Sequence, residues 1–451
     1  MPNQTVSERL ADWTTSLTWS EVPEQVQNRA RDRFLDAVST AIAGRDVASS
    51  TVARRAFART SGVCTSLVDD TLRSAEDAAL VNGVSVHSIL YEDIHAPSSD
   101  HPGPVLVPSI FAAAEERIAA GGEVTLEDLW SAILVGYEIQ IALGKVMAGN
   151  AVAQGFRTTS LFGSVAAAAA VARLWRLDAD ATAGAINMGA NFAFGFLEGW
   201  ALSTMEPYLH AGMAGRSGIT AARLGEAGVV TARLTFDGPN GYFRAFGSQN
   251  AAESFRIGAE WAIMNIWTKA YPLSAGKQRA TDAALDAVQQ GVRAEDIERA
   301  VVKMSPGTIM YPGADKAGHF DTFTQAQNST QFCVAAALLG KDMAEVSTFT
   351  EGYADPEICE FTKKISLLGE EERRATKAER LDIYLKDGSV SSHEVEWSEG
   401  RNATIEKMRA KLEKLTVGFW EEETPAELVE ATTGPVGASV DVLTRVLRKR
   451  S

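Results

Sequence analysis

Three of the six histidines lie within one fifteen-residue segment, at His87, His95 and His101. The same segment is rich in carboxylates and prolines, which favours a loop: Glu92, Asp93, Pro97, Asp100 and Pro102. An imidazole titrates near neutral pH, and a neighbouring carboxylate can orient it and tune its pKa. The segment therefore indicates general acid/base chemistry, and the alternative is a set of structural loop histidines bonded to the backbone.

Other chemistries have weaker signals. Asp93, His95 and His101 would offer one carboxylate and two imidazoles to a metal, but their spacing matches no zinc or non-haem iron signature, so no metal is expected. The chain has no G-x-G-x-x-G after a strand, no G-x-x-x-x-G-K-[ST] and no G-x-S-x-G. Nucleotide binding and serine-dependent acyl transfer are therefore not indicated.

Length and charge bound the class of protein. A chain of 451 residues with 45% hydrophobic content is too large for one compact core, so two domains are expected. A net charge of −15 argues against nucleic-acid partners and anionic membranes. The three cysteines form no C-x-x-C pair, the N-terminus is polar, and the longest apolar run, residues 165–172, is too short to span a bilayer. We expect a soluble, cytoplasmic protein.

Helical periodicity dominates the first half of the chain. Apolar residues recur at helical spacing over residues 22–44, with Pro23 near the start and Gly44 at the end. A second helix is expected from Thr125, whose hydroxyl can cap a turn containing Asp128, to about residue 146. The Ala-rich stretch 161–177 and the glycines that follow, including Gly212, predict closely packed helices.

The pattern changes after about residue 269. A strand is expected at 297–304, and an Asp387-Gly388 turn joins strands at 381–385 and 390–397. Helices are expected at 325–339, 356–368 and 405–415. The predicted fold is mainly α, with a large, discontinuous helical bundle domain (1–269 and 403–451) and a smaller α+β domain (270–402).

Several motifs resemble the MmgE/PrpD family. The segment ALVNGVSVHSILYEDIHAPSSDHPGPVLVPSI is similar to the family signature, in which a short Ala/Asn/Gly helix leads to acidic residues and then His-Pro. Further matches follow in the family's order: GYEIQ at 136–140, LHAGMAGRSG at 209–218, GPNGYFRAF at 238–246, KAYP at 269–272 and AQNS at 326–329. The resemblance covers nearly the whole chain.

The resemblance implies an enzyme without a cofactor, active on a small anionic substrate. Family members include 2-methylcitrate dehydratase, cis-aconitate decarboxylase and iminodisuccinate epimerase, which react at a carbon beside a carboxylate and have their site between a helical and an α+β domain. By motif position the implied catalytic residues are His101, Lys269, Asp93 as the group that orients His101, and Tyr311. The candidate substrate-binding residues are Arg157, His210, Ser274 and Lys277. The resemblance also implies a homodimer.

The sequence departs from the decarboxylase-like pattern at several positions. Pro207 stands where a lysine is expected, Arg157 and Ser274 stand where histidines are expected, and Ala142 replaces an arginine. Arg157 in place of a titrating histidine removes a proton shuttle but keeps a fixed cation that suits bidentate carboxylate binding. The expected function is a lyase, either a dehydratase or a decarboxylase, acting next to a carboxylate of a di- or tricarboxylic acid by proton abstraction. The alternatives are a two-base epimerase or isomerase and a non-catalytic carboxylate-binding homologue.

Overall fold

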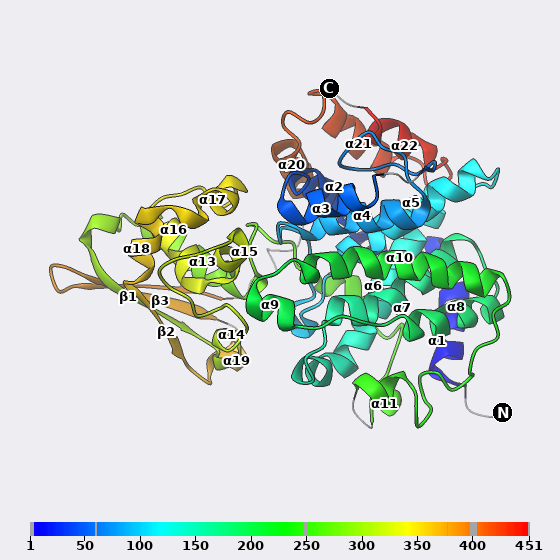
Figure 1. The fold of residues 1–451 in the computed structure, drawn as a ribbon, viewed down its shortest axis with the longest axis horizontal. Coiled ribbons are helices and arrows are strands. Elements are labelled where there is room, and N and C mark those ends of the chain that lie inside the picture. The colour runs from blue at the N-terminus through cyan, green and yellow to red at the C-terminus, as the bar shows by residue number, and fades with distance from the viewer. Residues whose placement is uncertain (1–3, 59–60, 248–249, 377, 397–403, 450–451) are drawn as a thin grey trace.

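The protein is described from a computed structural model. The structure describes residues 4–58, 61–247, 250–376, 378–396 and 404–449. Buried apolar side chains form two large clusters within these ranges, one drawn from residues 6–266 and 408–447 and the other from residues 273–383. Figure 1 shows the corresponding two parts side by side, with the helical part at the right and the sheet-containing part at the left.

Helices make up the larger part. They are α1 Val6–Ser16, α2 Glu24–Ala43, α3 Ala48–Ala56, α4 Ala75–His87, α5 Gly103–Ala119, α6 Leu126–Ala153, α7 Thr158–Leu174, α8 Ala179–Asn191, α9 Glu198–Leu202, α10 Glu206–Glu226, α11 Tyr242–Phe246, α12 Ala251–Ser254, α20 Ile405–Leu415, α21 Thr424–Thr433 and α22 Asp441–Leu447. The expected helix at 22–44 is confirmed as α2, and the expected Thr125 cap is confirmed as a capping box with Asp128 that opens α6.

The central helices pack closely because small residues line their contacts. A Cβ atom on Gly212 of α10 would lie 2.3 Å from the carbonyl oxygen of Leu80 in α4, so only glycine allows this approach. The approach brings the C-terminal end of α4, with His87, beside the first turns of α10. Helix α6 is long and apolar enough to cross a membrane, but 83% of its most apolar window is buried in the protein, as in a core helix.

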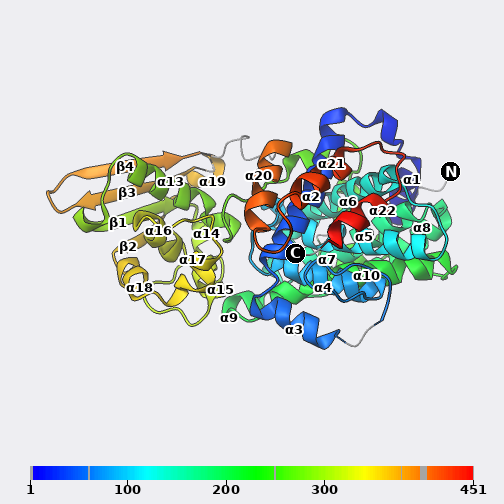
Figure 2. The same cartoon turned by 90° about the horizontal axis from the view of Figure 1, so that it is seen from above.

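The smaller part is built on a four-stranded mixed sheet. Its strands are β1 Ile297–Met304, β2 Ile365–Gly369, β3 Glu379–Leu385 and β4 Val390–Val395, in the order β2-β1-β3-β4, with β2 parallel to β1 and the other neighbours antiparallel. Helices α13 Gln278–Gln289 and α16 Thr330–Leu338 pack against the sheet (Figure 2), and the remaining helices are α14 Pro306–Ile309, α15 Phe323–Asn328, α17 Ser347–Thr350, α18 Pro356–Thr362 and α19 Arg373–Thr376. The expected fold class, a large helical bundle with a smaller α+β unit, is confirmed.

Two expected helices of the α+β part are wrong in detail. The helix predicted at 356–368 ends at Thr362, and Ile365–Gly369 is strand β2, because hydrogen bonding to β1 overrides the local helical pattern. The helix predicted at 325–339 divides into α15 and α16 at Ser329, whose hydroxyl accepts a hydrogen bond from the amide of Phe332 and caps the second helix. The predicted hairpin is confirmed to Val395, and Trp397 lies outside the described residues.

Segments far apart in the sequence meet at the junction of the two parts. Gln327 of α15 donates hydrogen bonds to the carbonyl oxygens of Ile89 and Pro272, both at 2.7 Å. Helix α20 packs on α2 (Figure 1), and its Lys411 contacts Asp36 and the carbonyl oxygen of Tyr91, both at 2.6 Å. The loop between α4 and α5 is therefore held from both sides. The domain limits at 269/270 and 402/403 stay a prediction.

Candidate active site

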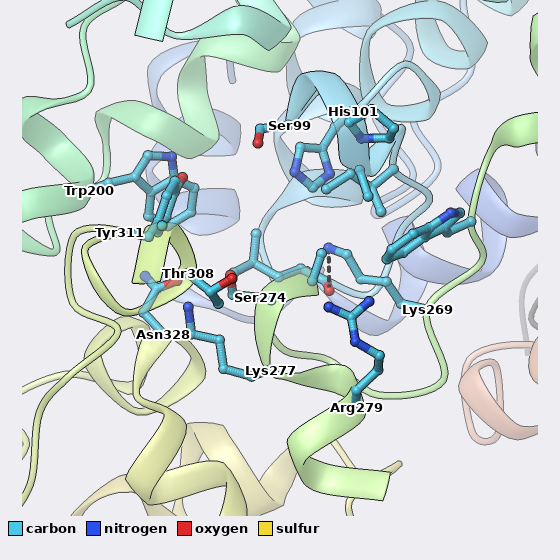
Figure 3. A pocket seen from close by; sticks show the side chains of 18 of the residues that line it. Ser99, His101, Trp200, Lys269, Ser274, Lys277, Arg279, Thr308, Tyr311 and Asn328 are labelled. Atoms are coloured by element: carbon cyan, nitrogen blue, oxygen red, sulfur yellow. Dashed lines mark hydrogen bonds between the residues drawn. The ribbon is translucent and has the colours of Figure 1, made fainter. Parts of the chain in front are cut away.

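A cavity of about 350 Å³ lies at the junction of the helical and α+β parts. Its walls come from the α4–α5 loop, the start of α7, α9, the segment before α13 and the segment after β1. Six of the eight residues selected from the sequence line it: His101, Arg157, Lys269, Ser274, Lys277 and Tyr311. In Figure 3, Trp200 and Tyr311 lie on one side of the cavity, and Lys269 and Arg279 lie on the other.

One carboxylate oxygen, Oε1 of Glu92, contacts three nitrogen atoms. These atoms are Nδ1 of His101 at 2.7 Å, Nδ1 of His87 at 3.0 Å and Nζ of Lys269 at 3.3 Å. Lys269 also donates to the carbonyl oxygen of Leu90 at 2.8 Å. All four ionisable side chains are buried, so their interactions are only weakly screened by solvent.

Burial and charge together set the protonation states of this cluster. Burial alone would raise the pKa of Glu92, but Lys269 and the two imidazoles hold it well below its usual range. Burial and then the nearby Lys269 ammonium lower the pKa of His101 well below its usual range, and burial lowers that of His87. The cluster at neutral pH is therefore an ionised Glu92 paired with Lys269 and flanked by two neutral imidazoles.

The hydrogen bonds select one tautomer for each imidazole. Nδ1 of His101 lies beside two acceptors, Glu92 and the carbonyl oxygen of Asp93 at 3.1 Å, so Nδ1 carries the proton. Its Nε2 then holds a lone pair and can act as a base. Nε2 of His87 accepts from the guanidinium of Arg157 at 3.0 Å, so His87 also donates to Glu92 through Nδ1.

Two non-glycine residues of the α4–α5 loop adopt left-handed backbone conformations, Leu90 with φ 54° and Ser99 with φ 50°. Each presents its carbonyl oxygen to a cation of the cavity: Leu90 to Lys269 at 2.8 Å and Ser99 to Arg157 at 3.5 Å. Unfavourable backbone conformations of this kind concentrate at functional sites, where the surrounding structure maintains them.

The expected role of Asp93 needs correction. Its carboxylate accepts hydrogen bonds from the Tyr137 hydroxyl at 2.6 Å and the Gly103 amide at 3.0 Å, and it lies 3.6 Å from Arg33. Asp93 meets His101 only through its backbone carbonyl. The neighbouring Glu92 is the carboxylate that orients the imidazole. The side chains of Glu92 and Asp93 point in different directions, and only that of Glu92 reaches the histidines.

Arg157 directly precedes α7, and its buried side chain lines the cavity. It donates to His87 and Ser99, and its guanidinium carbon lies 5.3 Å from the centroid of the Trp200 ring. Burial lowers the pKa of Arg157, but an arginine keeps its charge. The side chain is a fixed cation held by neutral neighbours, which suits it to bind a carboxylate.

The α+β part contributes a second cation opposite the cluster. Lys277, just before α13, is 1% exposed, and its Nζ lies 5.4 Å from the centroid of the Tyr311 ring. Burial lowers the pKa of Lys277 to about 8 and raises that of Tyr311, so the phenol is protonated at neutral pH. The hydroxyls of Ser274 and Thr308 face the same space (Figure 3).

His210 and His95 stay outside the cavity. His210 is half-buried in α10 and packs edge-on against the Phe194 ring at 5.8 Å, and burial lowers its pKa to about 4. His210 is not among the residues that line the cavity, and its role in substrate binding stays a prediction. His95 bonds to the hydroxyl of Ser98 at 2.6 Å within its own loop.

The geometry does not favour a metal centre. The metal set considered from the sequence is not brought together, since the carboxylate of Asp93 and the imidazole of His95 have other partners. Among the described residues the donor atoms of His87, Glu92 and His101 lie within 4.8 Å of one another. However, the Lys269 ammonium lies 3.3 Å from the same Glu92 oxygen, and it would repel a divalent ion.

Glu92 and His87 are the important residues that sequence reasoning did not select. Both fall in the histidine-rich segment, and Glu92 directly precedes Asp93. In a loop no helical or strand period decides which of two adjacent carboxylates points inward. Arg279, which pairs with Glu379 at 3.1 Å, was also not selected, because only the fold brings α13 to β3.

Comparison with known proteins agrees with this architecture. Residues 8–254 match the MmgE/PrpD N-terminal domain and residues 271–433 match the MmgE/PrpD C-terminal domain. The chain is 26% identical over 359 residues to the cis-aconitate decarboxylase-like protein oryM of Aspergillus oryzae, covering 75% of this chain and 74% of that protein. It is 22% identical over 417 residues to a cis-aconitate decarboxylase of Aspergillus terreus (87% and 84% covered) and 23% identical over 330 residues to that of Mus musculus (69% and 65%).

The two matches together span most of the chain and include every lining residue of the cavity except Trp267 and Lys269, which fall in the short interval between them. This chain belongs to the MmgE/PrpD family.

Proposed function

We propose that the protein is a cofactor-independent lyase that removes a proton from the carbon next to a carboxylate of a di- or tricarboxylic acid and then expels water or carbon dioxide. The observation that carries the proposal is the neutral His101, whose Nδ1 lies 2.7 Å from an ionised Glu92 while the side chain lines a cavity that also contains Arg157 and Lys277. The names of the decarboxylase relatives support the same reaction class.

His101 is the proposed base. Its Nε2 takes the proton from carbon, and Glu92 stabilises the imidazolium that forms, because the carboxylate lies 2.7 Å from Nδ1. The electron pair left on carbon passes into the adjacent carboxylate as an enolate. Arg157 and Lys277 are the cations available to stabilise that charge.

A proton donor must assist the departing group. In a dehydration, the bond from carbon to the hydroxyl oxygen breaks and the hydroxide leaves as water after accepting a proton. The protonated phenol of Tyr311 and the ammonium groups of Lys269 and Lys277 are the candidate donors among the residues that line the cavity. In a decarboxylation, the bond from carbon to a carboxylate breaks, carbon dioxide leaves, and the electron pair that stays on carbon takes a proton from one of these donors. The proton held by His101 returns to the carbon that lost it.

A two-base epimerase is the second candidate. It requires proton-transferring groups on opposite faces of the substrate carbon, and Tyr311 lies across the cavity from Lys269 in Figure 3. Burial raises the pKa of Tyr311, so its phenol stays protonated at neutral pH and is not available to remove a proton from carbon, which favours the lyase over the epimerase.

The test is a screen of di- and tricarboxylates in deuterated buffer, read by NMR. A lyase yields an alkene or a product that is shorter by one carbon, and an epimerase yields deuterium at the substrate carbon without elimination. The His101→Ala variant is the control and is expected to give neither signal. Ligand-induced thermal stabilisation without turnover or exchange would contradict both activities and would support a carboxylate-binding homologue.

The homodimer and the cytoplasmic location remain proposals. Several large apolar side chains on the helical part are exposed, among them Phe196, Leu202 and Val230, and they are candidates for a contact with a second copy. Light scattering on the purified 451-residue chain is expected to give twice the monomer mass of 48.3 kDa.

A further inference from the structure

The charges that line the cavity differ in whether they already have a partner. Four cationic side chains reach it. Lys269 is paired with Glu92 at 3.3 Å, and Arg279 is paired with Glu379 at 3.1 Å. These two cations are neutralised by the protein itself and leave little charge for a ligand.

The other two cations have no carboxylate within 4.0 Å anywhere in the described part of the chain. Arg157 is 2% exposed, and its hydrogen-bond and ring partners in the described residues are neutral: His87, the carbonyl oxygen of Ser99 and the Trp200 ring. Lys277 is 1% exposed and lies over the ring of Tyr311. Burying an unpaired cation is unfavourable, so these two side chains are prepared for two negative charges from a ligand.

The wall beside Lys269 and Arg279 is apolar. Ile94 and Trp267 face the cavity there and are joined by two backbone hydrogen bonds, of 3.0 and 2.9 Å, which hold this wall in place. Pro97 also lines the cavity, and the Leu90 side chain packs with Trp200 and Tyr208. A third carboxylate directed to this wall would lose its hydration without gaining a free cation, and Glu92 and Glu379 would repel it.

We propose, on the basis of the proton-abstracting site described above, that the substrate is a dicarboxylate carrying an apolar substituent, and not a tricarboxylate. One carboxylate binds at Arg157 and the other at Lys277. The substituent, a methyl group or a larger apolar group, contacts Ile94 and Trp267. The relatives are named for cis-aconitate, a tricarboxylate, so this proposal separates the chain from them in substrate and retains the reaction class.

Two matched pairs of compounds test the proposal by isothermal titration calorimetry at pH 7 and constant ionic strength. Methylsuccinate and propane-1,2,3-tricarboxylate share one skeleton and differ only by a methyl or a carboxymethyl group. Citraconate and cis-aconitate form the corresponding unsaturated pair. In each pair the dicarboxylate is expected to bind at least tenfold more tightly. Equal or tighter binding of the tricarboxylate, or no binding of either member, would overturn the proposal.

Two variants locate the effect. Lys277→Met is expected to weaken methylsuccinate at least tenfold and to leave the affinity for isobutyrate, a monocarboxylate, within about twofold. Ile94→Lys adds a cation to the apolar wall and is expected to shift the preference toward propane-1,2,3-tricarboxylate by at least tenfold. Equal losses of both ligands in Lys277→Met, or an unchanged preference in a folded Ile94→Lys, would count against the assignment.

The saturated compounds separate this inference from the proposed function. Methylsuccinate has no leaving group, so its binding is measured without any turnover. Tight, selective binding in a protein that turns over no substrate would refute the lyase and leave the dicarboxylate assignment standing. Turnover of cis-aconitate with weak methylsuccinate binding would refute the assignment and leave the lyase standing.

Discussion

Replacing Lys277 by methionine is expected to raise the free energy of unfolding, although it weakens anion binding. The ammonium group is buried with no carboxylate within 4.0 Å in the described ranges, and burial lowers its pKa from 10.5 to about 8. Methionine has a similar length and no charge, so it can pack over the Tyr311 ring without the cost of a buried cation.

The magnitude follows from the pKa shift. A folded-state value of about 8 against 10.5 in the unfolded chain is a difference of roughly 2.5 pH units. At about 1.4 kcal/mol per unit, keeping Lys277 charged costs the folded state on the order of 3 kcal/mol at pH 7. Between these two pKa values the unfolded chain binds more protons, so the stability of the natural protein rises with pH. The advantage of methionine should therefore shrink to roughly 1 kcal/mol at about pH 9.5.

Urea unfolding of the full chain at the two pH values tests this reasoning. The matched control is Lys386→Met, which removes an exposed lysine from the same α+β part and is expected to change stability by less than about 0.5 kcal/mol. A Lys277→Met variant that gains no stability at pH 7, or gains the same amount at both pH values, would refute the claim that Lys277 is a buried, uncompensated cation.

Three further predictions concern the Glu92 cluster. Lys269→Ala should lower the melting temperature because it leaves the Glu92 charge buried and unpaired, at a cost of about 3 kcal/mol or more, and Glu92→Gln in the same chain should restore most of the loss, as thermal unfolding can show. His101→Ala should abolish turnover with little change in melting temperature. In the natural enzyme the lowered pKa of His101 keeps the imidazole neutral in mild acid, so kcat/KM should stay high as pH falls below about 6.5 and should fall only in stronger acid. His87→Phe should raise KM more than it lowers kcat, because Arg157 loses the acceptor that holds it; an unchanged KM would show that Arg157 is held without His87.

Much of the fold could be predicted because its local signals are strong. The periodicity of α2, the Thr125 capping box of α6 and the Asp387-Gly388 hairpin are encoded within a few residues each. Strand β2 was not predictable, because its five residues are a strand only through their pairing with β1, some sixty residues earlier.

The site was predictable in part, because some of its residues fall in short sequence motifs. The motif residues His101 and Lys269 both line the cavity, although they lie far apart in sequence, and their catalytic roles stay predictions. Which of Glu92 and Asp93 faces the histidines, and whether His210 reaches the cavity, depends on the packing of a loop and a helix face that no local pattern encodes.

The sequence by itself determined the family, the mainly helical class and the histidine- and carboxylate-rich segment of the site, because these depend on composition, periodicity and motif order. Only the tertiary structure decided the electrostatics. Burial pairs Lys269 with Glu92 and leaves Arg157 and Lys277 without a carboxylate partner in the described residues, and these pairings arise from segments that meet only in the folded chain. Whether a cation is available to bind a ligand depends on which charged groups lie near it in the folded protein, and these neighbours cannot be read from the sequence.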